Sequence, residues 1–449
     1  MAESYFNYKI EQFLIESSDG KNVIDATSCV SSIQYFEDLF SPSIFVSMLL
    51  TDTDGLLSSL PNEDPNKSPG IKGGERVNLT VRQPGTGKSI ILDETKNTYY
   101  IYKVHGSTTQ STKEVFSVEL CPAEVFQNET SRVIRKYKGN IGDTVNEILK
   151  NVLSTTNYSA KNIEKTSNEY VFYGNNKRPF TVLTWLCPKS IPAKSKSDTD
   201  KGTAGFLFFQ NKNGFNFKSV DSLMSGFELN TTNKVDIPTY FYTEVVDNPA
   251  SNNANFRISS IPVFEKNVNI MENLRIGMYS TQNYFFDVNE RKFNIYNYTL
   301  KDSYPLMSHA SKTNKTPQVP LDLDTKEHPS RIMVRVLDNF SSDPADEPSS
   351  TINKSKDNTL YYQAQSVARY NLAFSQKLNI TIPLNLKLTV GDIIELNFGY
   401  ITKEDGKKGT KDREKSGYYL IKELSHLFEQ NQGWTGLKLI RDSYGEPPE

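Results

Sequence analysis

The segment PGTGKS (Pro84–Ser89) has the Gly-Lys-Ser ending of a phosphate-binding loop. In such loops the backbone N–H groups and the lysine hold phosphate oxygens, and a helix beginning directly after the loop supplies much of the anion binding. The full pattern needs a glycine where this chain has Arg82, and the β-branched and aromatic residues after Ser89 favour a strand. We therefore predict a turn between two strands, with a nucleotide-hydrolysing enzyme as an alternative that requires a helix after Ser89.

A second candidate is the acidic segment LDLDTKEHP (Leu321–Pro329). Oxygen ligands at alternating positions can hold Ca²⁺, and the segment contains a set of such side chains: Asp322, Asp324, Glu327 and His328. No glycine stands at the bend that a calcium loop needs, and polar residues surround the segment. The pattern favours a solvated acidic loop.

The remaining reactive residue types are dispersed along the chain. The other histidines are His105, His309 and His426, and the three cysteines are Cys29, Cys121 and Cys187. Their spacing matches neither a zinc ribbon nor a disulfide framework, which predicts buried thiols in a reducing compartment. The mixed-charge run Lys403–Lys415 is predicted to be a solvated hairpin tip, although a projecting tip can also be a docking arm. We predict no catalytic, cofactor-binding or metal-binding residue and no cofactor.

Composition narrows the class of protein. The 449 residues suffice for two to four domains, and the 24 tyrosines and 25 phenylalanines argue against a disordered chain. A net charge of −2 provides no global positive field that could hold nucleic acid. The N-terminus lacks the apolar core of a signal peptide, and the apolar run Ile44–Leu50 is too short to span a bilayer. We therefore expect no stable membrane insertion.

The elements that organise the chain lie near its C-terminus. GDIIELNF (Gly391–Phe398) alternates apolar and polar residues with period two, as a half-buried strand does. Two further runs with strand character follow, Tyr418–Phe428 and Trp434–Ile440, separated by the turn-forming residues Gln430–Gly433. Three strands joined by polar loops predict an antiparallel meander.

A similar set of strands occurs earlier in the chain. GERVNLTV (Gly74–Val81) matches GDIIELNF, YYIYKV (Tyr99–Val104) matches YYLIKE (Tyr418–Glu423), and VEL (Val118–Leu120) matches LKL (Leu437–Leu439). The interval from Tyr99 to Val118 equals that from Tyr418 to Leu437, 19 positions in each case. Self-similarity at fixed offsets indicates a repeated architecture. Two related units in one chain would let a cyclic trimer place six similar units around one axis.

The middle of the chain changes period. An amphipathic helix is predicted over Ile141–Ser154 with Asp143 as its N-cap, and a short helix over Arg178–Pro188. Residues 205–220 are predicted to form a hairpin with Asn213-Gly214 at its turn. Strands are expected again over Ile270–Tyr279 and Asn283–Asp287, and a helix over Leu360–Lys377.

The order of these parts resembles the central baseplate hub protein of contractile-tailed phages, whose fold is shared with the N-terminal part of type VI secretion spike proteins. The likeness covers most of the chain and is strongest over Tyr362–Ser443, where a helix, a Val-Gly-Asp turn and the strand YLIKELSH occur in the hub's order. The segment 301–359 is expected to be longer than the corresponding loops of the phage hub.

The resemblance implies a mainly β fold with an α insert, in which two related antiparallel β-barrel tube domains flank a helix-containing module. The expected ranges are 1–125 for the first tube domain, 126–255 for the α+β insert, 256–300 with 360–445 for the second tube domain, and 301–359 for a long polar loop region.

The resemblance also implies a role: a non-enzymatic homotrimer in the baseplate of a phage virion, made in the host cytoplasm. The implied partners are the tail tube proteins, a trimeric tail spike protein and neighbouring baseplate wedge proteins, with DNA passing through the channel without sequence-specific binding. The alternative from another class is a tail-associated carbohydrate-binding protein or cell-wall hydrolase. That alternative predicts a concave pocket with converging carboxylates and stacked aromatic rings.

Overall fold

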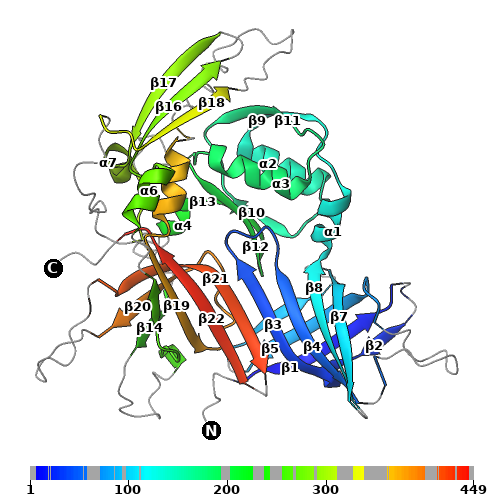
Figure 1. Ribbon diagram of the computed structural model, residues 1–449. Coiled ribbons are helices and arrows are strands. Elements are labelled where there is room, and N and C mark those ends of the chain that lie inside the picture. The colour runs from blue at the N-terminus through cyan, green and yellow to red at the C-terminus, as the bar shows by residue number, and fades with distance from the viewer. Residues whose placement is uncertain are drawn as a thin grey trace, which may run out of the picture.

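The computed structural model shows a large sheet of 14 strands, three smaller sheets and several short helices among the residues it describes (Figure 1). The structure describes residues 7–443 with the exception of 19, 21, 54, 58–70, 85, 94–97, 111–112, 194–202, 226–236, 243–254, 266–268, 288–290, 311–326, 338–361, 363, 400–411, 413 and 430–431. Asp322 and Asp324 of the predicted acidic loop, and most of the predicted hairpin tip 403–415, therefore lie outside the described residues.

The first part of the large sheet, here called the first β-unit, comes from the N-terminal part of the chain. Its elements are β1 (Lys9–Glu16), β2 (Val23–Asp25), the 3-10 helix η1 (Thr27–Cys29), β3 (Val30–Asp38), β4 (Phe45–Asp52), β5 (Arg76–Gln83), β6 (Lys88–Leu92), β7 (Tyr99–Gln110) and β8 (Lys113–Pro122). The period-two pattern places alternate side chains on opposite faces. In β4, for example, Val46, Met48 and Leu50 are buried in the core.

The second β-unit contains the C-terminal meander. Its strands are β14 (Thr239–Tyr242), β15 (Val263–Glu265), β19 (Gln376–Pro383), β20 (Ile393–Phe398), β21 (Gly417–Glu429) and β22 (Gln432–Arg441). The two β-units stand beside one another in Figure 1, and one continuous hydrophobic core, extending from Phe13 to Ile440, includes residues of both.

The two β-units share one strand order. In the first unit the neighbours are β3-β4-β8-β7-β5, and in the second they are β15-β19-β22-β21-β20. All of these pairs are antiparallel, and the strands follow the same order along the chain. The repeat predicted from Gly74–Leu120 and Gly391–Leu439 is therefore present in the fold.

The turn that precedes β5 in the first unit and the turn that precedes β20 in the second unit have the same pattern of hydrogen bonds. A glycine N–H donates to the carbonyl of an isoleucine, whose own N–H donates to the carbonyl of the acidic residue that follows the glycine. The residues are Gly74, Ile101 and Glu75 in the first unit (2.7 and 2.9 Å), and Gly391, Ile421 and Asp392 in the second (3.1 and 2.9 Å). Both glycines have φ +92°, a conformation that side chains other than glycine rarely adopt.

The predicted match between Tyr99 and Tyr418 is wrong by one residue. Val77 lies opposite Tyr99, and the corresponding Ile394 lies opposite Tyr419. The register shifts after Ile101 and after Ile421, at equivalent places, but a second shift between His105 and Thr108 exists only in β7. The second shift means that β7 contains one residue more than β21. Because both strands also contain a Tyr-Tyr pair, the spacing of 19 positions matched Tyr99 to Tyr418 instead of Tyr419.

The two glycines provide a matched test of the repeat. We expect Gly74→Ala to cost about 1 kcal/mol, since only the positive φ opposes a side chain and an added Cβ would meet no atom within 4 Å. Gly391→Ala should cost about 1 kcal/mol more, because its Cβ would lie 3.2 Å from Phe209 Cζ. Urea unfolding of the two variants measures the difference. Equal losses would contradict the packing described for Gly391.

The insert lies above the two units in Figure 1. Its elements are α1 (Ala123–Thr130), β9 (Lys136–Asn140), α2 (Ile141–Asn151), β10 (Tyr158–Ile163), β11 (Glu169–Tyr173), α3 (Pro179–Leu186), η2 (Cys187–Lys189), β12 (Phe206–Asn211), β13 (Gly214–Ser219) and α4 (Val220–Met224). Val145, Ile148, Leu183, Phe206 and Phe217 belong to its separate core. Both predicted helices are therefore present, each with its apolar face in this core.

Two details of the insert differ from the predictions. Helix α2 begins after Asn140, so Asp143 lies in its first turn rather than at the N-cap. The hairpin turn is Lys212-Asn213, because Asn211 pairs with Gly214. Gly214 has φ +105°, and an added Cβ would lie 2.3 Å from the carbonyl oxygen of Asn157, so close packing requires glycine at the strand start.

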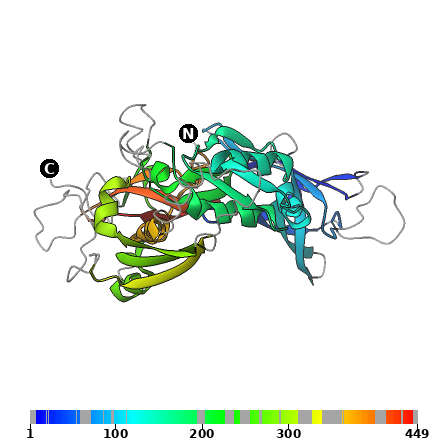
Figure 2. The ribbon, with the colours of Figure 1, turned by 90° about the horizontal axis from the view of Figure 1, so that it is seen from above.

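A separate sheet lies beside the insert, with the order β17-β16-β18. Its strands are β16 (Ser280–Asp287), β17 (Lys292–Thr299) and β18 (Arg331–Leu337), accompanied by α6 (Ile270–Ile276), α7 (Leu300–Ser303) and η4 (Tyr304–Leu306). Seen from above, this sheet and the first β-unit lie on opposite sides of the molecule (Figure 2).

The prediction of a strand over Ile270–Tyr279 is wrong. The side chain of Asn269 accepts a hydrogen bond from the N–H of Glu272 at 3.1 Å, and Gly277 ends the helix with φ +81°. An N-cap asparagine and a terminal glycine stop a helix of seven residues at both ends. The two capping residues are visible in the sequence, but the predicted strand rests on the apolar residues between them.

Strand pairing differs from the expected ranges in three places. β14, expected in the insert, pairs with β20 in parallel. β16 and β17, expected in the second unit, pair with one another and with β18 instead. β18 lies within 301–359, the expected loop region, because RIMVRVL is a short run rich in apolar and β-branched residues, which favours a strand. The division into four domains remains a prediction, but these strands indicate where its boundaries would move.

The predicted fold class is confirmed: the chain is mainly β, with a helix-containing insert between two related and largely antiparallel units. None of the described helices is long and apolar enough to span a membrane.

Candidate functional site

The two β-units join through a pair of strands, β21 and β3. The C-terminal half of β21 pairs with β3 from Glu423 opposite Asp38 to Glu429 opposite Ser32. Lys422 Nζ lies 3.7 Å from Asp38 Oδ1, and the Lys422 carbonyl accepts a hydrogen bond from the N–H of Leu39 at 2.8 Å. This seam makes a continuous sheet from two units with the same strand order.

The strand of the first unit that corresponds to β21 is β7. Only the first residues of β7 pair with β5, and no described strand pairs with that side of β7 from Tyr102 onward. The strand that corresponds to β3 is β15, which stands at the end of the large sheet and pairs, among described strands, with β19 alone. The two halves of a second seam are therefore present, but at different edges of the same chain.

The open edge of β7 carries a charged cluster centred on Glu119 of β8. Glu119 Oε1 lies 2.6 Å from His105 Nε2 and 3.4 Å from Lys103 Nζ, and Oε2 accepts a hydrogen bond from Tyr102. The bonds from Tyr102 and His105 lower the pKa of Glu119, so the carboxylate stays ionised at neutral pH. Charged groups on an exposed edge limit unspecific strand pairing.

A buried carboxylate holds the insert against both units. Glu37, in β3, has no exposed surface, and its two oxygens accept hydrogen bonds from Tyr35 Oη (2.7 Å), Lys212 N (2.7 Å) and Val390 N (2.9 Å). Burial raises the pKa of Glu37, and these three donors oppose that rise. The group is called the Glu37 junction below.

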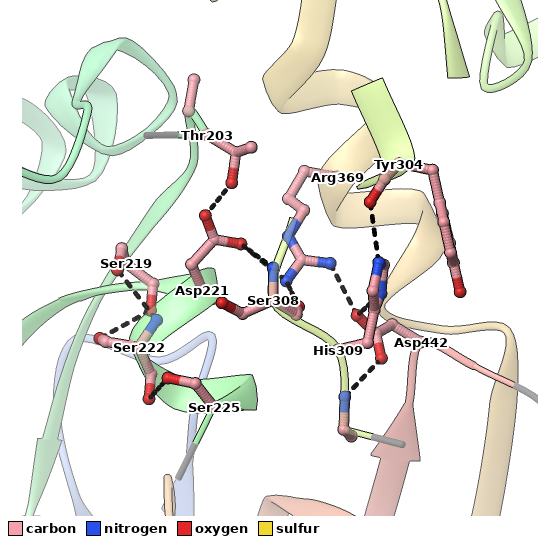
Figure 3. Close-up of polar contacts among 12 residues, drawn as sticks. Thr203, Ser219, Asp221, Ser222, Ser225, Tyr304, Ser308, His309, Arg369 and Asp442 are labelled. Carbon is pink, nitrogen blue, oxygen red and sulfur yellow. Dashed lines mark hydrogen bonds and ion pairs between the residues drawn. The ribbon is translucent and has the colours of Figure 1, made fainter. Parts of the chain in front are cut away.

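A second buried group, the Arg369 junction, joins the insert, the C-terminal end of β22 and the segment after η4 (Figure 3). Arg369, in the helix over residues 364–372, contacts Asp442 at 2.7 Å and Asp221 of α4 at 3.0 Å, and both Arg369 and Asp442 are fully buried. His309 Nδ1 lies 3.0 Å from Asp442, and its Nε2 lies 2.9 Å from the Tyr304 carbonyl. Although burial opposes the charge on Asp442, His309 and Arg369 hold its pKa well below the usual value.

The Arg369 junction contains a histidine and two carboxylates, but its donors and acceptors already face one another. Asp442 also accepts the N–H of Ala310 at 3.0 Å, and Arg369 donates to the carbonyl of Ser308 at 2.6 Å. Figure 3 shows these side chains pointing toward one another across the three segments. This arrangement joins the insert, the end of β22 and the segment after η4.

The candidate site segments that the sequence suggested lie in different parts of the structure. Thr86 and Gly87 form a turn, and Lys88 and Ser89 begin β6, so PGTGKS precedes a strand and lacks the helix of a phosphate-binding loop. Of the acidic segment, only 327–329 is described, and Glu327 and His328 are exposed there. Among the described residues, no three histidine, cysteine, aspartate or glutamate side chains gather closely enough to hold a metal ion.

The dispersed histidines have separate environments. His105 is part of the Glu119 cluster, and His309 belongs to the Arg369 junction. His426 is buried in β21 against Tyr35, where burial and the charge of Lys212 lower its pKa to about 3. The predicted burial of the three cysteines is confirmed.

Sequence reasoning missed Glu37, Arg369 and Asp442 as functional residues. Glu37 contacts Val390 across 353 positions of the chain, and Arg369 contacts Asp442 across 73. No local motif marks such residues. One weak signal was the period-two position of Glu37 on the same face as Ile33 and Tyr35, because a charge on a buried face needs partners.

Comparison with known proteins gives matches to solved structures only, since no family model and no curated protein matches the chain significantly. A tail protein from Neisseria meningitidis matches with 10% identity over 98% of both chains and a TM-score of 0.49. The 43 kDa tail protein of prophage MuSo2 from Shewanella oneidensis matches with 11% identity over 97% of this chain and 100% of its own, also with a TM-score of 0.49.

The E. coli c3393 protein, a type VI secretion component similar to the T4 tail proteins gp27 and gp5, matches with 10% identity over 98% of this chain and 79% of its own, with a TM-score of 0.39. The chain is thus similar along its length to proteins of the group that its sequence resembles. Similarity at TM-scores below 0.5 does not decide its function, which has to be inferred from the geometry of the chain.

Proposed function

We propose that this chain is a structural hub of a phage tail baseplate, in which three copies form a ring of six similar β-units. The ring would join the tail tube to a central trimeric spike, contact neighbouring wedge proteins and let DNA pass without sequence-specific binding. It would be made in the host cytoplasm and reside in the virion.

The observation that carries this proposal is the seam between β21 and β3, together with the corresponding strands β7 and β15, which each have an open edge. Within one chain, a strand of the second unit pairs with a strand of the first. The corresponding strands, β7 and β15, lie at separate edges and can meet only between copies. An edge strand that pairs head to tail with the next copy generates a closed ring when the rotation permits.

The internal seam defines the register of the proposed one. The strand pairing within each unit shows that His105 of β7 occupies the position of Ser425 in β21, and that Glu265 of β15 occupies the position of Phe36 in β3. In the internal seam, Ser425 lies opposite Phe36. His105 of one copy should therefore lie opposite Glu265 of the next. The pair combines an imidazole with a carboxylate, so it adds no repulsion between like charges.

A cross-link tests this register. His105→Cys with Glu265→Cys should give disulfide-linked trimers on mild oxidation, because directly opposite residues have Cα atoms about 4.5–5.5 Å apart, within disulfide range. The matched control is Ser425→Cys with Phe36→Cys, which should close a disulfide inside one chain. The three native cysteines are buried and should not interfere.

Two measurements on the unmodified protein accompany the cross-link. Light scattering should give three times the chain mass, and an image down the ring axis should show pseudo-six-fold symmetry. If the control disulfide forms while the test pair stays unlinked and the mass is that of one chain, the ring proposal is wrong.

A further inference from the structure

A pocket of about 370 Å³ lies where the first β-unit, the insert and the second β-unit meet. Its lining includes Lys88 of β6, Lys212 and Asn213 of the β12–β13 turn, Asn157 before β10, and Lys387 after β19. Among the described residues, no acidic side chain lines it. The pocket therefore lacks the converging carboxylates that the hydrolase alternative predicts. Its lysine side chains make it positively charged instead.

Buried hydrogen bonds hold the walls of this pocket in place. The fully buried side chain of Gln83 donates to the Leu384 carbonyl at 2.6 Å and accepts from the Leu386 N–H at 3.2 Å, which fixes the end of β5 beside the loop that carries Lys387. Lys212 Nζ donates to the Leu388 carbonyl at 3.2 Å, and the Lys212 N–H donates to Glu37. The positions of all three lysines thus depend on contacts between the modules.

Two of the pocket lysines differ from the lysines of the large sheet that form ion pairs. Lys103 and Lys438 pair with Glu119 and Glu423, respectively. In contrast, the ammonium groups of Lys88 and Lys387 have neither an ion-pair nor a hydrogen-bond partner within the described part of the chain, and the side-chain amide of Asn157 also lacks one there. The pocket therefore combines positive charge with uncommitted donors.

Lysine acts as a point charge for phosphate, and amide donors complete the coordination of its oxygens. We infer that this pocket binds a phosphate group that bridges the two β-units and the insert. The phosphate could belong to a free oligophosphate or to the DNA backbone, and both present the same oxyanion. The site does not use the phosphate-binding-loop mechanism, because Lys88 begins a strand. The inference does not depend on trimer formation.

Calorimetric titration of the full-length protein with pyrophosphate at constant ionic strength tests the site. We expect saturable binding that Lys88→Gln with Lys387→Gln weakens at least about tenfold, because the charge-assisted hydrogen bonds of both lysines to the phosphate are lost. The matched control is Lys150→Gln with Lys301→Gln, which removes two exposed lysines outside the pocket. Its net charge is therefore the same as that of the Lys88→Gln, Lys387→Gln variant. This control should bind pyrophosphate as the unmodified protein does.

A competing duplex of 20 base pairs distinguishes the two sources of phosphate. Displacement of pyrophosphate by the duplex identifies the DNA backbone, whereas undisturbed binding identifies a small oligophosphate. Either result agrees with the inference. Equal weakening in both lysine pairs, no saturable binding, or tighter binding of a hexa-aspartate peptide than of pyrophosphate would overturn it. None of these results bears on the cross-link between His105 and Glu265, so the two proposals fail independently.

Discussion

Replacing Arg369 with alanine should lower the free energy of unfolding by about 3–5 kcal/mol, because two carboxylates would lose their buried counter-charge. Arg369 contacts Asp442 at 2.7 Å and Asp221 at 3.0 Å. Asp442 would keep His309 as a partner, and Asp221 would keep its hydrogen bonds from Thr203 and from the Ser308 N–H, but neither carboxylate would keep the guanidinium charge. The junction joins three modules, so the loss should appear as separation of the insert from the second β-unit before global unfolding.

The control for this prediction is Arg178→Ala. Arg178 also contacts a carboxylate, Glu129 at 2.9 Å, but about half of each side chain is exposed. Exposed pairs contribute less than about 1 kcal/mol, so urea unfolding should show little change. Similar losses in the two variants would mean that burial of the Arg369 junction does not stabilise the protein.

Acid unfolding gives a second measurement of the same change. The pKa of Asp442 is lowered in the folded state, so its contribution to stability is present above the unfolded value near 3.9 and is lost as the pH falls below it. Removing Arg369 should raise that pKa, and the acid midpoint of Arg369→Ala should move to higher pH. An unchanged midpoint would contradict the coupling between the two groups.

Replacing Glu37 with glutamine should cost about 3 kcal/mol, even though the two side chains have nearly the same shape. The carboxylate accepts through both oxygens, from Tyr35 and Lys212 on one and from Val390 on the other. An amide has a single acceptor oxygen, so its NH₂ group would face a buried backbone N–H. Lys212 would also lose its buried counter-charge.

Glu11→Gln is the matched control, because Glu11 makes an exposed pair with Arg82 at 3.3 Å. We expect a change within about 0.5 kcal/mol for this surface substitution. Hydrogen exchange should locate the effect of Glu37→Gln at the β12–β13 turn and at Val390. A loss confined to β3 would show that Glu37 does not hold the modules together.

Several features could be predicted because they depend on local periodicity. The period-two pattern of Gly391–Phe398 and the apolar stripe of α2 depend on residues close together in sequence. The repeated glycine and acidic residue before Val77 and Ile394 were likewise visible, because one turn geometry demands the same residue types twice. The prediction of a strand over Ile270–Tyr279 is wrong because this segment is too short to show a clear period. There the capping residues Asn269 and Gly277 are a better guide to the structure than the apolar content.

The sequence by itself determined the mainly β character of the chain, the helices of the insert and the presence of two similar β-units. The tertiary structure alone decided which strands pair across the seam, why PGTGKS forms part of a lysine-lined pocket, and which polar residues hold the modules together. Local patterns arise from steric and hydrophobic preferences of neighbouring residues. The energy of a buried group such as Glu37 depends instead on partners that chain folding brings together from distant positions.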